Sequence, residues 1–117
     1  MATAVQNSSM IKTGTFTSAA TAAYNLVLGF IPQYFLLINT TAVKRFEWIH
    51  GMTAAYVFTT ETAASNNAYT TSNGFTEYTG ATGPTVSSGT TPGNSTGITM
   101  GTAVHSSGDV CFYLAIA

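Results

Sequence analysis

The feature that most constrains the fold is an apolar run at residues 25–39, NLVLGFIPQYFLLIN. The run is closed by asparagine at both ends, well short of the roughly 20 apolar residues that a membrane-spanning helix needs. Pro32 lacks a backbone donor and would disrupt a helix, whereas the many β-branched and aromatic residues favour strands. The run therefore predicts two strands, 24–29 and 34–39, joined at a corner that contains Gly29 and Pro32.

Alternating or two-sided apolar patterns predict the other strands. In 43–52 the aromatic residues Phe46 and Trp48 share one face, which is typical of a half-buried strand. The final segment, 108–117, is apolar on both faces and predicts a central strand. Further candidate strands lie in 12–19, 54–63, 65–80 and 97–104. Roughly seven or eight short strands without a helical pattern predict an all-β fold, an antiparallel β-sandwich of jelly-roll-like type or a related barrel.

Two segments differ from the rest of the chain in amino-acid composition. Residues 1–12 are small and polar and predict an extended N-terminal arm, so 13–117 would be a single β-sandwich domain. Residues 79–97 are rich in Gly, Thr and Ser and predict a long loop, which in a compact domain suggests a task or a partner. We expect partner contacts from the apolar residues of these segments, which are Val5, Met10, Ile11, Pro84, Val86 and Pro92.

The large apolar residues of the predicted strands are the candidate core. We expect the core to include Phe30, Tyr34, Leu36, Ile38, Phe46, Trp48, Phe112 and Leu114. A core position is favoured over direct partner contact for four of the aromatic residues, namely Phe30, Tyr34, Phe46 and Trp48.

Charge is scarce in this chain. Charged residues make up 6% of the sequence and the formal net charge is −1, against about 25% charged residues in typical soluble proteins. Near-zero net charge favours association, so one alternative to an ordinary Thr-rich surface is a subunit of an assembly. Lys12, Lys44 and Arg45 are too few for the phosphate contacts of nucleic-acid binding. The N-terminus lacks a secretory signal pattern, which predicts synthesis in the cytoplasm without a membrane partner.

The sequence offers little for catalysis, and we expect no enzyme activity, no cofactor and no metal site. Glu47 and His50 would point to opposite faces of one strand, so they cannot hold a metal together. The cluster of His105, Ser106 and Asp109 is typical of a turn, because a catalytic triad needs members from separate elements. The lone Cys111 lies in an apolar strand and predicts a buried structural thiol.

Several short motifs resemble small virion proteins of tailed bacteriophages. They are GTFT, the GFIPQY corner leading to an Asn-Thr turn, FEWIHGM, and the last strand GDVCFYLAIA. The resemblance covers most of 13–117, although relatives often end in a basic residue and this chain ends at Ala117. It is similar to capsid decoration, or cement, proteins and to modules of tail fibres.

The resemblance implies a structural role in the virion. A decoration protein binds the major capsid protein on the capsid surface as a homo-oligomer, a trimer being favoured over a dimer, and stabilises the joints between capsid subunits. The alternative is a tail-fibre or receptor-binding module whose loop contacts host surface glycans. A small carbohydrate-active enzyme ranks last, because carboxylates are few.

Overall fold

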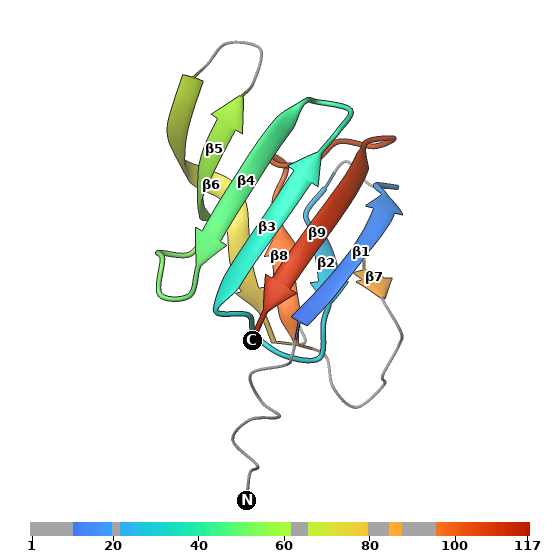
Figure 1. Cartoon of the computed structure of the whole chain (residues 1–117), viewed down its shortest axis with the longest axis vertical. Helices are drawn as coiled ribbons and strands as arrows, with labels where there is room; N and C mark the ends of the chain where they lie inside the picture. The colour runs from blue at the N-terminus through green and yellow to red at the C-terminus, as the bar shows by residue number, and fades with distance from the viewer. Residues whose placement is uncertain (1–10, 20–21, 62–65, 80–84, 88–95) are drawn as a thin grey trace, which may run out of the picture.

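The computed structural model describes residues 11–19, 22–61, 66–79, 85–87 and 96–117, and all regular structure in them is β (Figure 1). The all-β class predicted from the sequence is confirmed. The nine strands are β1 (Ile11–Thr17), β2 (Tyr24–Val27), β3 (Tyr34–Asn39), β4 (Lys44–Ile49), β5 (Tyr56–Glu61), β6 (Asn66–Tyr78), β7 (Thr85–Ser87), β8 (Gly97–Met100) and β9 (Val110–Ile116).

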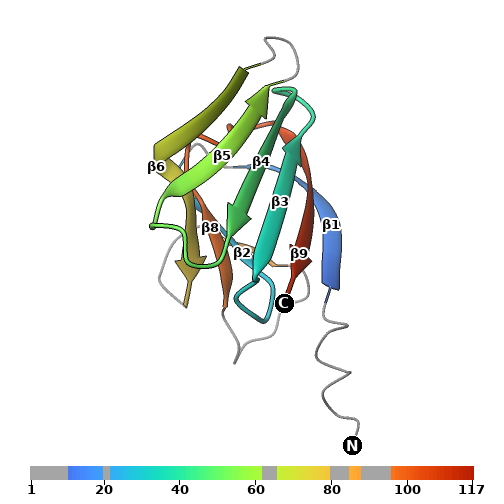
Figure 2. The same ribbon diagram turned by 60° about the vertical axis from the view of Figure 1, so that its left-hand side comes forward.

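Hydrogen bonds join these strands into one sheet in the order β1-β9-β3-β4-β5-β6-β8-β2-β7. Neighbouring strands are antiparallel except β2 and β7, which are parallel. The sheet curls into a half-barrel, so that β1, β9, β3 and β4 form a front wall and β8 and β2 lie behind it (Figures 1 and 2). The sequence predicted two packed sheets, whereas here the two walls belong to a single curled sheet.

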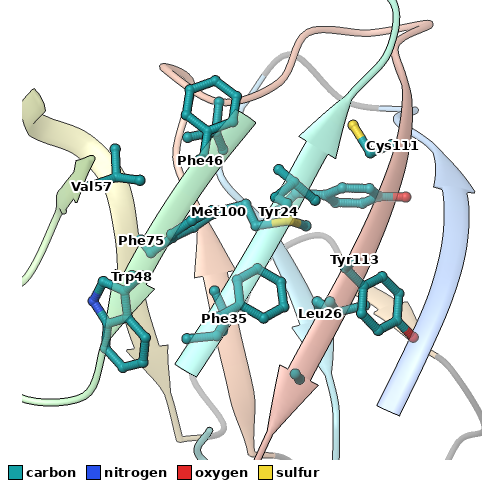
Figure 3. Packing of buried hydrophobic residues seen from close by; sticks show 14 of the residues in the cluster. Tyr24, Leu26, Phe35, Phe46, Trp48, Val57, Phe75, Met100, Cys111 and Tyr113 are labelled. Atoms are coloured by element: carbon teal, nitrogen blue, oxygen red, sulfur yellow. The ribbon is translucent and has the colours of Figure 1, made fainter. Parts of the chain in front are cut away.

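The core fills the concave side of this sheet (Figure 3). Phe35 of the front wall meets Phe75 of the opposite wall edge to face, with ring centroids 5.1 Å apart. Phe46 contacts the same ring at 6.5 Å, so Phe75 joins two strands of the front wall. Edge-to-face pairs of this kind add to the stabilisation from apolar burial. The other buried members are Tyr24, Leu26, Leu28, Leu37, Trp48, Val57, Ile98, Met100, Val104, Cys111, Tyr113 and Ala115.

Strand alternation corrects part of the predicted core. Phe46 and Trp48 are buried, and Phe30 is half-buried against the cluster. In contrast, Ile38 and Phe112 are 39% and 47% exposed, so the prediction that they are core residues is wrong for this chain by itself. The remaining three predicted core residues are half-buried on the convex side of the sheet, namely Tyr34, Leu36 and Leu114. β3 and β9 carry apolar residues on both faces. The residues on the concave face, which are Phe35 and Leu37 of β3 and Cys111, Tyr113 and Ala115 of β9, form the core in place of the predicted ones.

The predicted corner carries the chain from one wall to the other. β2 and β3 are not sheet neighbours, because β2 pairs with β8 and β7 while β3 pairs with β9 and β4. The amides of Leu28 and Gly29 both donate to the Thr96 carbonyl, at 2.8 and 2.9 Å. Gly29 has a φ of 90°, which the corner requires and which glycine adopts without strain.

The boundaries of the predicted arm and loop differ from the structure where it describes them. β1 begins at Ile11, inside the predicted arm, and β7 lies within the predicted 79–97 loop. The rest of the arm and most of the loop lie outside the described residues.

Candidate interaction surface

The convex side of the front wall carries rows of apolar side chains that no other described element covers. Ile38 of β3 lies opposite Phe112 of β9, and the next rows pair Leu36 with Leu114 and Tyr34 with Ile116. Neighbouring strands are about 4.8 Å apart, so these rows form one continuous surface. We call it the outer face, and it comprises Ile11, Tyr34, Leu36, Ile38, Ile49, Phe58, Val110, Phe112, Leu114 and Ile116.

Several large apolar side chains of this surface are exposed. Ile11 on β1 and Ile49 on β4 are 55% and 58% exposed, and Phe112 on β9, between these strands, is 47% exposed. Apolar patches on monomers rarely exceed a few hundred Å², and larger ones mark interaction sites. The outer face therefore has the composition of an interface.

Two groups of polar side chains lie within the outer face. One is the row of exposed threonines of β1, Thr13, Thr15 and Thr17, which lie opposite Leu114, Phe112 and Val110. The other surrounds Glu47. The Tyr34 hydroxyl donates a hydrogen bond of 2.7 Å to Oε2 of Glu47, and Arg45 Nη2 lies 3.8 Å from Oε1 of the same carboxylate. Burial, together with the hydrogen bond and the negative charge of Glu47, raises the pKa of Tyr34 to about 12. The phenol therefore stays protonated. The outer face thus carries the opposite charges of Arg45 and Glu47 next to each other, surrounded by apolar residues.

The β3–β4 turn extends this surface. Val43 has a φ of 58° and is 52% exposed. This left-handed conformation is unfavourable for a β-branched residue. Its side chain borders a surface hollow of about 320 Å³ that Ile38 and Arg45 also line. Strain of this kind tends to occur at functional positions, which favours a binding role for the turn.

A buried polar pair joins β1 to the turn that precedes β9. Ser18 Oγ lies 2.8 Å from Nδ1 of His105, and Nε2 of His105 lies 3.2 Å from the Met100 carbonyl oxygen. Burial lowers the pKa of His105, so the neutral ring donates from Nε2 to Met100 and accepts from the Ser18 hydroxyl. Ser18 and His105 are 2% and 3% exposed. The pair therefore stabilises the turn before β9, and the Ser18 hydroxyl is not accessible as a nucleophile. The two residues are 87 positions apart, so no local sequence pattern predicts their contact.

The predicted turn cluster is held by Asp109. Its Oδ2 accepts from the Ser106 amide at 2.9 Å and from Asn39 Nδ2 at 2.8 Å. Asn39 Nδ2 also donates to the Val104 carbonyl, so the network ties the end of β3 to this turn. His105 instead faces Ser18, and the three cluster residues form no triad.

The other titratable residues singled out in the sequence are separated by the fold. Glu47 lies on the outer face, whereas His50 Nδ1 is 3.0 Å from Oε2 of Glu77. Cys111 is fully buried, and burial raises its thiol pKa to about 12. In the described part of the chain, no three His, Cys, Asp or Glu side chains are grouped to hold a metal ion. That same part contains no helix long and apolar enough to cross a membrane.

The residues predicted for partner contact fall in two groups. Ile11 begins β1 and belongs to the outer face, and Val86 lies in β7. The remaining four, Val5, Met10, Pro84 and Pro92, lie outside the described residues. The sequence thus missed the strand positions that form the outer face, because their apolar pattern predicts core positions.

Comparisons with protein-family models, with curated proteins and with solved structures give no match to this chain.

Proposed function

We propose that this chain is a structural virion protein of a tailed bacteriophage that decorates the outer capsid surface and stabilises the joints between capsid subunits. It acts there as a homo-oligomer, a trimer in preference to a dimer. The observation that carries the proposal is the outer face, an apolar sheet surface with exposed Ile38, Phe112 and Ile49. The sequence motifs that resemble virion proteins add the capsid as the partner.

The outer face supports the association of copies of this chain. A stable interface buries about 800 Å² on each partner and has an apolar, aromatic centre. The rows of β9, β3 and β4 supply such a centre, and Arg45 beside Glu47 supplies opposite charges for a second copy. A net charge of −1 leaves little repulsion between subunits.

The capsid contacts are assigned to other segments. The N-terminal arm, residues 1–12, and the Gly/Thr/Ser-rich loop, residues 79–97, are the parts that would become ordered on the major capsid protein. The function is binding without a reaction, so this is not an enzyme and requires no cofactor. Nucleic acid and membranes are not partners, and the protein is made in the host cytoplasm before it joins the virion.

The test combines oligomeric state with capsid binding. Analytical ultracentrifugation of the full chain should show an oligomer, and cryo-electron microscopy of capsids mixed with it should show copies in multiples of the shell symmetry. Phe112→Lys places a charge on the outer face and should give monomers with weakened capsid binding. Ser72→Lys makes the same charge change at an exposed position of β6 outside that face and should leave both unchanged.

Two results would contradict the proposal. A soluble monomer of the unmodified chain that ignores capsids would remove its basis. Density for the chain only at the tail tip would favour the receptor-binding alternative.

A further inference from the structure

A cavity of about 320 Å³ opens between the end of β4, the connection at 50–55 and the second half of β6. Its walls combine apolar and polar groups, with Met52, Phe75 and Trp48 on one hand and Thr76, Glu77 and Thr79 on the other. The outer-face residues are not among these lining residues. The cavity is therefore a separate feature, and its ligand chemistry is independent of the proposed oligomer.

A sharp bend of β6 creates the cavity. The pairing of β5 with β6 changes register between Tyr56 and Val57, which sends the second half of β6 across to β8. Two backbone hydrogen bonds of 2.9 Å, from Ala55 to Phe75 and from Gly74 to Ala55, hold the bend. A Cβ at Gly74 would lie 2.7 Å from the Ala55 carbonyl oxygen, so only glycine permits this approach. The rigid bend fixes the cavity wall.

Trp48 contributes an unused hydrogen-bond donor to this site. The side chain is 2% exposed and lines the cavity, and its Nε1 has no acceptor within the described part of the chain. A buried tryptophan N–H usually has a partner, because leaving it unpaired costs free energy. Nε1 itself exposes less than 1 Å², so an acceptor on a bound molecule would remove this cost when the indole turns toward the cavity.

The opposite wall supplies a carboxylate that is already oriented. Oε2 of Glu77 lies 3.0 Å from Nδ1 of His50, and both side chains are about two-fifths exposed, at 41% and 43%. The His50 ring also stands perpendicular to the Trp48 indole, with centroids 6.2 Å apart. An anion would be repelled by Glu77, whose second carboxylate oxygen remains open beside the one that His50 contacts. Thr76 and Thr79 add neutral hydroxyl groups to the lining. A neutral ligand with several hydroxyl groups suits this combination, because its hydroxyls donate to the open carboxylate oxygen and exchange hydrogen bonds with the threonines.

We propose that this cavity binds a neutral saccharide unit, one pyranose ring of a glycan. The ring hydroxyls would contact Glu77 and the threonine hydroxyls, the C–H face would pack against Met52, and a ring or N-acetyl oxygen would accept from Trp48 Nε1. The volume lies at the lower end of the range for small-molecule sites, which suits a single ring.

The experiment uses Trp48, the only tryptophan in the chain, as the reporter. The full-length protein labelled with ¹⁵N gives one indole cross-peak, and we would titrate it with glucose, galactose, mannose and N-acetylglucosamine. At least one of them should shift the indole peak and the Thr76 and Glu77 amide peaks with a common millimolar dissociation constant. Glu77→Gln should weaken that binding about tenfold, since a hydrogen bond to a charged group is lost.

Two matched variants separate the site from general effects. Glu61→Gln changes a carboxylate that pairs with Lys44 at 3.4 Å, outside the cavity, and should bind the sugar like the unmodified protein. Ala54→Leu fills the cavity from an exposed position and should abolish binding while the protein stays folded.

Other outcomes would overturn the inference. They are the absence of saturable shifts with all four sugars, unchanged sugar affinity in Ala54→Leu, or a stronger response to n-butylammonium or acetate than to any sugar. The last result would assign the cavity to a charged ligand.

Discussion

Ile38 and Phe112 lie directly opposite each other on β3 and β9, and both project from the outer face. Their neighbours along the strands, Leu37 and Cys111, are fully buried on the other side of the sheet. A single pair of strands thus separates a core from a candidate interface by strand alternation alone.

This separation predicts different effects for neighbouring substitutions. The double substitution Ile38→Thr and Phe112→Thr should lower the free energy of unfolding of the monomer by no more than about 1 kcal/mol. The reason is that both side chains are already well exposed in the folded monomer. Phe35→Ala should cost about 3–5 kcal/mol, because it opens a cavity in the core. Urea denaturation at low protein concentration measures both. Equal losses in the two proteins would contradict the assignment of the faces.

Gly14 predicts a steric limit on the edge strand β1. It lies opposite Tyr113 of β9, and a Cβ there would lie 2.7 to 2.8 Å from the tyrosine ring. The ring is 7% exposed and packs against Phe35 with centroids 6.1 Å apart, so it cannot move freely. Gly14→Ala should therefore destabilise the protein by about 1–3 kcal/mol in thermal or urea unfolding.

A double-mutant cycle identifies the cause of this effect. In a Tyr113→Leu background the ring is absent, so Gly14→Ala should cost clearly less than in the unmodified chain. The same cost in both backgrounds would place the origin elsewhere.

The left-handed backbone conformation of Val43 leads us to expect that glycine at this position stabilises the protein. Its φ of 58° strains a β-branched residue, whereas glycine adopts this conformation freely. Val43→Gly should raise the free energy of unfolding by about 1 kcal/mol. Ala42→Gly, next to it and without a positive φ, should lower it by up to about 1 kcal/mol. If Val43 serves binding, Val43→Gly should also weaken oligomer formation, and retained binding would show that the strain has no such role.

His105 predicts a loss of stability in mild acid. Burial lowers its pKa below the value of 6.5 that it has in the unfolded chain. The folded state then binds fewer protons than the unfolded state, so stability is complete above pH 6.5 and falls as the pH drops through the folded-state pKa. The hydrogen bond to the Met100 carbonyl, the charge of Asp109 and a backbone hydrogen bond to Ala22 oppose this lowering of the pKa, and the Ser18 hydroxyl also faces the ring.

Unfolding free energies measured across this pH range check the prediction. His105→Gln should be less stable at neutral pH but should show a flatter pH dependence. His50→Gln, at an exposed histidine, should keep the steep dependence. A steep dependence that survives in His105→Gln would assign it to another group.

Much of the strand pattern could be predicted from the sequence because it is local. Pro32 and the β-branched residues around it excluded a helix, and the predicted strands 24–29 and 34–39 agree with β2 and β3 to within two residues. The candidate sites could not be predicted in this way. Ser18 and His105, or His50 and Glu77, meet only because distant strands lie side by side.

The sequence by itself determined that this chain is built from strands, because proline, glycine and side-chain branching act on neighbouring residues. Only the tertiary structure decided which face of each strand is buried. β3 and β9 are apolar on both sides. Alternation therefore divides the residues of each strand into two sets but does not indicate which set is buried. The curl of the sheet placed Phe35 and Tyr113 inside and left Ile38 and Phe112 outside, because one concave side can enclose only one set.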